Sequence, residues 1–184
     1  MKTAFRGTLL ASAPLIAAMP LIVDTSARVH PSVPTTDATC VLHSHGPHAA
    51  TAKGGGSKLP APDTLATTGT VTCVDPAGAP VASGAFERTT PRPASKCTGH
   101  EREAPSTTTV HWHDGTTSTV HFDKSDIDRA NGTASLVASG EVTADSDHFA
   151  TDTVKAVGTS TGPGCDAPAG KTALDSTLVL RLIH

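Results

Sequence analysis

The stretch that most constrains the fold is residues 107–122, TTTVHWHDGTTSTVHF, because it contains the only tryptophan of the chain and has the pattern of a β-hairpin. Val110 and Trp112 are two residues apart, so they lie on one face of a strand. The even-numbered residues of the return strand lie on the same face only if each residue stands opposite one whose number is even when its own is even, and odd when its own is odd. A three-residue loop at 113–115, with its glycine in the left-handed conformation, satisfies this condition and sets Val110 opposite Ser118.

Short segments of alternating polar and apolar residues, separated by Gly, Pro, Asn and Asp, continue on both sides of this hairpin. No segment has a helical period of useful length. The pattern predicts an all-β chain of about eight or nine strands, folded as an antiparallel β-sandwich or barrel that is mainly a meander. Apart from the hairpin, we expect strands near residues 39–43, 66–74, 81–88, 133–143, 149–157 and 174–183. The polar segment 123–132 is expected to connect two strands.

Residues 1–27 have the features of a secretory signal peptide. Positive charges precede an apolar run at 9–23, and small residues stand before a cleavage point after Ala27. Residues 28–65 are predicted to be a flexible N-terminal arm with a candidate first strand, and residues 66–184 to be the β-domain. We therefore expect a secreted, extracellular protein.

The cysteines predict two disulfides, because an even number of them in an exported chain is typical of a disulfide framework. The four are Cys40, Cys73, Cys97 and Cys165. We favour the pairs Cys73–Cys97 and Cys40–Cys165, which would tie the first strand region to the last. The alternative pairs Cys97 with Cys165, because their spacing around Trp112 is like that of an immunoglobulin domain. No two cysteines have C-x-x-C spacing, so neither a zinc knuckle nor a thioredoxin-type motif is expected.

The hairpin and the segment after it form a longer pattern, a W-x-x-G-x-x-S-x-V hairpin followed by G-x-V and then F-x-x-D. In this pattern the chain resembles a group of small secreted β-proteins of high-GC Gram-positive bacteria, whose function is not established. The resemblance extends from about Thr68 to the C-terminus and implies a fold without implying a function. The matching positions are Trp112, Gly115, Ser118, Val120, Gly140, Val142, Phe149 and Asp152.

Ten histidines are the one compositional excess that suggests chemistry. His43 and His45 would share a face of a strand, and His48 could approach them from a following loop, so these three are candidate ligands for Zn, Cu or Ni. If the signal peptide is cleaved after Ala27, His30 becomes the third residue, where its imidazole, the free amine and two amide nitrogens could bind Cu or Ni. Apart from these metals no cofactor is expected. The alternative is that these histidines are exposed and bind nothing.

Three other patterns are weaker. Residues 158–162 fit G-x-S-x-G, but the sequence predicts no helix after them, as a nucleophile elbow requires. Two groups of aspartates could reach a calcium ion, although EF-hand spacing is absent and turn or surface roles are the simpler interpretation. The two groups are Asp123, Asp126 and Asp128, and Asp145, Asp147 and Asp152.

The net charge of −3 and the lack of a basic patch give no indication of nucleic-acid or membrane-surface binding. The apolar run at 9–23 is too short and too interrupted for a membrane span. A cell-envelope component or another protein is the expected kind of partner. We expect a secreted, non-enzymatic extracellular or cell-surface β-domain of unknown ligand. Two alternatives remain open: an extracellular metal-binding protein that uses histidines, and a small secreted hydrolase or inhibitor.

Overall fold

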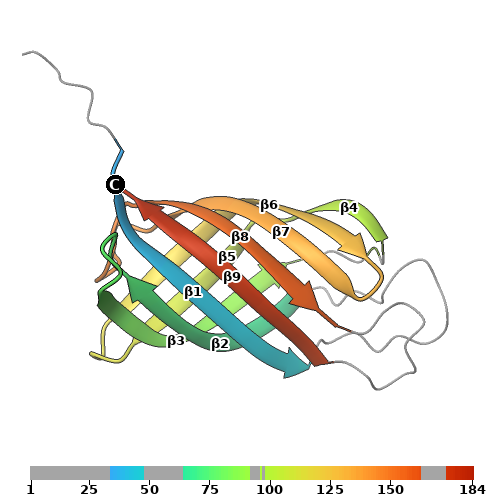
Figure 1. The fold of residues 1–184 in the computed structure, drawn as a ribbon, viewed down its shortest axis with the longest axis horizontal. Coiled ribbons are helices and arrows are strands. Elements are labelled where there is room, and N and C mark those ends of the chain that lie inside the picture. The colour runs from blue at the N-terminus through green and yellow to red at the C-terminus, as the bar shows by residue number, and fades with distance from the viewer. Residues whose placement is uncertain (1–33, 48–63, 92–95, 97, 163–172) are drawn as a thin grey trace, which may run out of the picture. The chain divides into compact units, whose positions relative to one another are not determined.

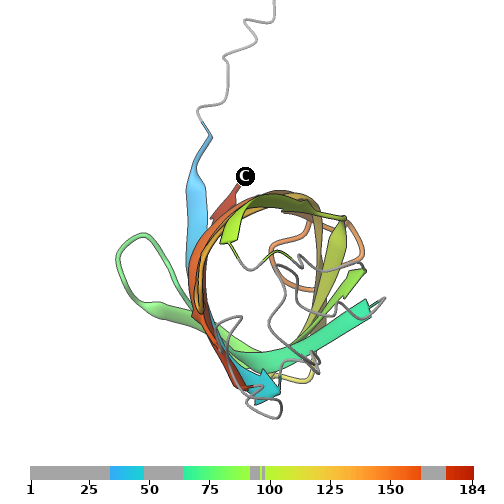
Figure 2. The same cartoon turned by 90° about the vertical axis from the view of Figure 1, so that its right-hand side faces the viewer.

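The computed structural model of the protein describes residues 34–47, 64–91, 96, 98–162 and 173–184. Within these residues the chain is all β and forms a closed eight-stranded antiparallel barrel with one additional strand (Figure 1). Figure 2 shows the barrel almost end-on. Among the described residues there is no helix of the length and apolarity that crossing a membrane requires. The strands are β1 (Thr36–Pro47), β2 (Thr64–Val74), β3 (Pro80–Pro91), β4 (Thr98–Glu103), β5 (Ser106–Trp112), β6 (Thr117–Ala130), β7 (Thr133–Val142), β8 (Thr153–Thr161) and β9 (Ala173–Ile183).

The barrel is a meander, as the sequence predicts. Each of its strands pairs with the next one in the chain, and β9 pairs with β1 to close the ring. The additional strand β4 lies end to end with β5 beside β6: Ser106 of β5 is opposite Phe122, and Glu103 of β4 is opposite Ser125. Between β4 and β5 stands Pro105, which has no backbone N–H to donate to a continuous ladder. Strand β4 therefore prolongs β5, and eight strands close the barrel.

Strand β6 overturns one expectation. Its second half lies within the polar segment 123–132, which is predicted to be a connection, whereas the strand continues to Ala130. A register shift relative to β7 skips Asp123, and beyond this bulge Ser125 and Ile127 are buried on the inner face. The prediction was wrong because the inward-facing residues of this half of β6 include polar ones such as Ser125. The segment therefore lacks the apolar alternation by which strands are recognised.

The predicted hairpin is confirmed. Val110 lies opposite Ser118, and the backbone N–H of Trp112 donates to the carbonyl oxygen of Thr116 at 2.9 Å. Gly115 has a φ of +88°, the left-handed conformation that the three-residue loop requires. Trp112 is buried in the barrel, where its indole N–H donates to Ser118 Oγ at 2.9 Å.

Three large aromatic side chains fill the interior, and each stands opposite a glycine of the neighbouring strand. The pairs are Phe86 with Gly69, Trp112 with Gly84, and Phe122 with Gly140. A Cβ atom on Gly140 would lie 2.0 Å from the carbonyl oxygen of His121, so no side chain fits there. A glycine leaves space beside it that a large cross-strand neighbour covers. This arrangement explains how a chain with 3% aromatic residues fills a barrel.

Cys40 and Cys73 lie directly opposite each other on β1 and β2 and form a disulfide. The favoured pairs Cys73–Cys97 and Cys40–Cys165 are therefore wrong. These pairs followed from the prediction that the region before residue 66 is a flexible arm joined to the rest only by a distant disulfide. In the structure the barrel closes with β1 between β2 and β9, so Cys40 lies beside Cys73. Cys97 and Cys165 lie outside the described residues, and the alternative pairing of these two stays a prediction.

The barrel extends further toward the N-terminus than the predicted β-domain. Strand β1 pairs with both β2 and β9, so this part of the predicted arm, residues 28–65, belongs to the barrel. The expected signal peptide, residues 1–27, lies outside the described residues. Strand β8 begins at Thr153 rather than near 149, because residues 143–152 form a loop whose Phe149 packs against Trp112.

Candidate functional site

The interior of the barrel differs in character between its two ends. At one end, aliphatic and aromatic side chains leave a cavity of only about 20 Å³. We call this the packed end; its lining includes Cys40, Val71, Val110, Trp112, Val120, Val142, Phe149, Leu180 and Leu182. At the other end a cavity of about 110 Å³ remains. We call this the polar end; its lining includes Ser44, Leu65, Thr67, Arg88, Thr90, Glu103, Ile127, Arg129, Leu136 and Leu178.

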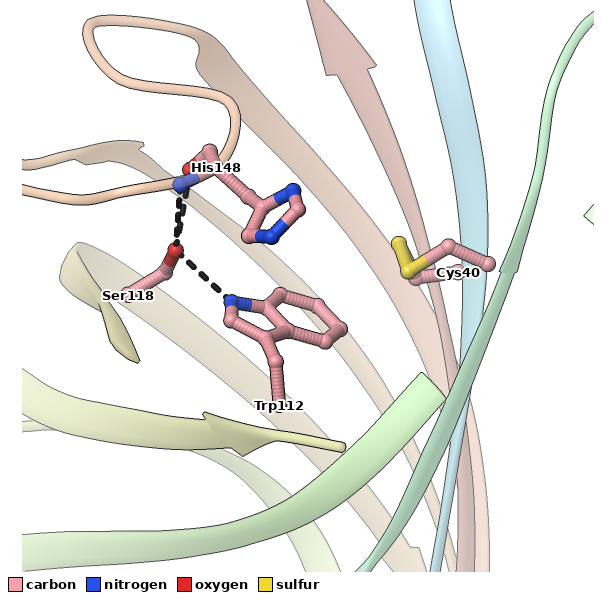
Figure 3. Close-up of a disulfide and its surroundings, with 5 residues drawn as sticks. Cys40, Trp112, Ser118 and His148 are labelled. Atoms are coloured by element: carbon pink, nitrogen blue, oxygen red, sulfur yellow. Dashed lines mark hydrogen bonds between the residues drawn. A yellow bond between two sulfur atoms is a disulfide. The ribbon is translucent and has the colours of Figure 1, made fainter. Parts of the chain in front are cut away.

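A hydrogen-bonded network closes the packed end (Figure 3). Ser118 Oγ accepts the indole N–H of Trp112 and donates to the carbonyl oxygen of His148, both at 2.9 Å. The ring of His148 stands edge-on to Trp112 with centroids 5.3 Å apart, and its Nε2 lies 2.8 Å from Asp114 Oδ2. Hydrogen bonds from Thr116, and then the contact with His148, lower the pKa of Asp114 to about 2. Trp112 and Ser118, two positions of the resemblance pattern, therefore have a structural role.

Arg88 is the central side chain of the polar end. It occupies an inward position of β3, and its Nε and Nη2 donate to Ser106 Oγ at 3.3 and 3.1 Å. Its Nη2 also lies 3.5 Å from Glu103 Oε2, and its guanidinium carbon lies 5.3 Å from the centre of the Phe122 ring, within cation–π range. Burial lowers the pKa of Arg88 and the charge of Glu103 raises it. The guanidinium keeps its proton at physiological pH, since arginine does so in proteins generally.

Among the described residues, the lining of the polar end contains more cationic than anionic side chains. Glu103, the last residue of β4, points inward, and its side chain is 7% exposed. Arg129, from the second half of β6, lines the same cavity as Arg88. Two guanidinium groups thus face one carboxylate, and among the described residues the lining has one net positive charge.

The cavity of the polar end is suited to a small ligand. Its floor and walls include the apolar side chains of Leu65, Ile127, Leu136 and Leu178, and serine and threonine hydroxyls stand among them. An apolar cavity of about 150 Å³ is enough to bind benzene in another protein. A volume of about 110 Å³ is smaller, which limits the enclosed part of a ligand to a short chain or at most one ring.

The described lining contains few groups that can act as a base. In the described part of the chain it offers hydroxyl groups, but no histidine, cysteine or lysine beside them. A serine or threonine needs a neighbouring base to act as a nucleophile. The one carboxylate of the described lining, Glu103, is 3.5 Å from the guanidinium of Arg88. Among the described residues, the lining therefore does not place a hydroxyl beside a free base.

The histidines predicted as metal ligands lie elsewhere. His43 and His45 are exposed on the outer face of β1, and they share that face as expected. His43 Nδ1 is 3.0 Å from Thr177 Oγ1, and His45 Nδ1 contacts the carboxylate of Asp175. Within the described ranges neither histidine joins two further converging ligands. His48 and His30 lie outside the described residues, so metal binding at these four positions stays a prediction.

The weaker patterns are placed as follows. Ser160, of the G-x-S-x-G match, lies within β8 rather than at a strand-to-helix turn, so it is not on a nucleophile elbow. Asp126 Oδ1 accepts a hydrogen bond from Arg102 Nε at 2.9 Å, which lowers the pKa of Asp126, and Asp128 Oδ1 lies 3.2 Å from His100 Nδ1. Both aspartates therefore contact basic side chains on the outer face of β4 and β6.

One group of ligand-type side chains was not predicted. Asp37, Asp152 and His184 each offer one donor atom, and these atoms lie within 4.8 Å of one another. The sequence interpretation took Asp152 as a turn residue, although it is 1% exposed. Burial raises the pKa of Asp152, and its hydrogen bond with His184 acts in the opposite direction. The sequence signals only Asp152, through its place in the F-x-x-D pattern. Asp37 and His184 lie far from it in the sequence, at the start and at the end of the barrel, so no local pattern joins the three.

Comparison of the chain with protein-family models, with curated proteins and with solved structures found no match. The function must therefore be inferred from the geometry of the barrel itself.

Proposed function

We propose that the protein is a secreted, non-enzymatic β-barrel that binds a small extracellular molecule in its polar end. The ligand has an apolar body of about one ring and a single negatively charged group. Secretion rests on the signal-like residues 1–27, and the Cys40–Cys73 disulfide supports it, since disulfides persist mainly in oxidising compartments.

The observation that carries this proposal is a buried guanidinium beside a cavity with apolar walls. Burying a charged group is unfavourable unless it is paired and hydrogen-bonded, and Arg88 has such partners in Glu103 and Ser106. Ligand sites typically combine an apolar pocket with a few fixed polar groups. Arginine suits carboxylates because its planar fork donates two parallel hydrogen bonds. With Arg129 in the same lining, the net positive charge favours an anionic group over a neutral one.

Benzoate is the probe of choice, because it joins one small apolar ring to one carboxylate, the two features that the apolar walls and the arginines of the lining favour. Isothermal titration calorimetry is expected to show saturable binding of benzoate and weaker binding of benzamide, its neutral counterpart. Amide chemical shifts should change around Leu65 and Ile127, at the polar end, and not around Trp112. If benzoate does not bind, or if benzoate and benzamide bind equally well, the proposed ligand class is contradicted.

Two arginine variants separate the cavity from the general charge of the protein. Arg129→Met removes a positive charge from the lining and keeps Arg88 beside Glu103, so benzoate affinity should fall by about tenfold, a typical effect of losing one charge-assisted contact. Arg102→Met removes the same charge on the outer face, where the side chain is 66% exposed, and should leave affinity unchanged. An equal loss in both variants would mean that benzoate responds only to net charge.

A further inference from the structure

We propose that Asp37, Asp152 and His184 form a binding site for a divalent cation of the zinc type, at the rim of the packed end. This site lies away from the polar end and is independent of the ligand proposed there. It also differs from the histidine sites predicted from the sequence, since it contains none of those histidines.

The donor atoms are spaced as ligands of one ion. His184 Nδ1 lies 3.1 Å from Asp152 Oδ1. Two ligands of a tetrahedral zinc ion, with bonds of about 2.0–2.1 Å, are themselves about 3.3 Å apart. All three donor atoms lie within 4.8 Å of one another, and Asp37 is exposed, so its carboxylate can complete the site by side-chain rotation.

Asp152 provides an independent indication of a missing partner. Its side chain is 1% exposed, and Oδ2 is buried without a hydrogen-bond partner in the described structure. Only Oδ1 has a partner, the imidazole of His184. A buried carboxylate oxygen without a partner is costly, and a second carboxylate, that of Asp37, increases the cost by repulsion. A cation between the two carboxylates would offset both effects.

The backbone around the cluster is shaped to bring these groups together. The register between β1 and β9 shifts between Thr36 and Ala38, so Asp37 is the extra residue of a bulge, a device that redirects a side chain. Thr151, next to Asp152, has a φ of +69°, which is unusual for a β-branched residue. Such strain persists only where the surroundings hold it, and it gathers at functional sites. The three donors belong to the start of β1, the loop before β8 and the residue that follows β9, so a bound ion would cross-link the seam of the barrel.

The donor set selects the class of ion. Calcium prefers six to eight oxygen ligands, and magnesium prefers an octahedron of oxygens. Zinc instead accepts both imidazole nitrogen and carboxylate oxygen, and sites with three protein ligands leave the fourth tetrahedral position to water. Zinc is therefore the ion to test.

The test is a titration of the untagged full chain with zinc chloride, followed by calorimetry and by the imidazole resonances of the histidines. We expect one zinc ion per chain, a shift of the His184 resonances and a higher melting temperature. His184→Ala should weaken binding by about tenfold or more, the order of loss seen when a metal site is disturbed. This side chain is 67% exposed, so its removal does not threaten the fold. Asp152→Asn should have the same effect if the variant folds.

His43→Ala/His45→Ala is the matched control, since it removes two imidazoles from the outer face of β1 and leaves the cluster intact. It should bind zinc as the wild type does. The inference is overturned if zinc does not bind, if His184→Ala binds it unchanged, or if the control variant loses it. Calcium binding as tight as that of zinc would overturn the assignment to the zinc class.

Discussion

The two ends of one barrel are built on different principles. The packed end contains the disulfide, Trp112 and Phe149, and leaves about 20 Å³ unfilled, whereas the polar end contains Arg88, Glu103 and Arg129 around about 110 Å³. At the packed end the strands are joined by residues 75–79, 113–116 and 143–152, of which the last folds against Trp112. We infer from the contrast that apolar packing at one end provides most of the stability of the barrel. The other end is then free to hold charged groups, which is where binding residues are expected.

Two leucines of β9 give the largest expected effect. Leu180 lines the packed end and Leu178 lines the polar end, so the same truncation can be made at both. Leu180→Ala should cost about 3–5 kcal/mol in free energy of unfolding, because it leaves a void among tightly packed neighbours. Leu178→Ala should cost about 2 kcal/mol, because its methyl groups already border a cavity. Urea unfolding followed by circular dichroism measures both.

Equal losses in the two leucine variants would break the comparison, since they would mean that the polar end is as tightly packed as the other. A larger loss for Leu178→Ala would reverse it. Leu178 is 8% and Leu180 is 3% exposed, so burial alone does not predict a twofold difference.

The disulfide gives the next effect. Cys40 and Cys73 are separated by 33 residues. In the entropic model, closing a loop of that length raises the free energy of the unfolded chain by about 3–4 kcal/mol. Cys40→Ala/Cys73→Ala should lower the free energy of unfolding by up to this amount. The whole barrel should still unfold in one transition, because the bridge belongs to the single core of the molecule. Separate melting of the two ends would show that they are independent units.

Peptide mapping of the native protein under non-reducing conditions sharpens the same point. It should recover a peptide that joins Cys40 to Cys73. The remaining cysteines, Cys97 and Cys165, are then expected to pair with each other, as the alternative interpretation of the sequence has it. Free thiols at these two positions would refute the prediction of two disulfides.

The packed end was largely predictable from the sequence, and the polar end was not. Parity of residue numbers and one left-handed glycine fix the register of the hairpin, so Val110 and Ser118 could be placed opposite each other. The strands near the packed end alternate between apolar and polar residues, which is the signal that sequence patterns report. At the polar end, Ser125 and Arg88 take inward positions that no hydrophobicity pattern marks.

The closure of the barrel limited the prediction of sites in the same way. A seam between β1 and β9 joins residues from the two ends of the chain, and no local pattern reports it. For this reason the pairing of Cys40 was wrong and the cluster of Asp37, Asp152 and His184 was missed. The candidate histidines His43 and His45 were placed correctly on one face, yet a shared face does not supply a third ligand.

The buried pair of the polar end gives an intermediate effect. Arg88 and Glu103 have side chains 14% and 7% exposed, so each depends on the other more than a surface pair would. A double-mutant cycle with Arg88→Met and Glu103→Gln should give a coupling energy of about 1–3 kcal/mol. The exposed pair of Arg102 and Asp126 is the matched control and should couple more weakly, because solvent screens it. Equal coupling in both pairs would mean that water fills the polar end and screens its charges.

Acid titration of the packed end gives the smallest effect. The pKa of Asp114 is lowered from 3.8 to about 2, mainly by hydrogen bonds from Thr116 and then by His148. Because the folded-state pKa lies below the ordinary value, this group stabilises the fold above about pH 4, and its contribution is lost as the pH falls toward 2. The melting temperature of the wild type should therefore fall more steeply between pH 4 and 2 than that of Asp114→Asn, with no difference in slope above pH 5. Since the ring of His148 stands 5.3 Å from Trp112, tryptophan fluorescence reports the change at this end. Parallel slopes in the two proteins would show that the hydrogen bonds of Asp114 with Thr116 and His148 are not formed in solution.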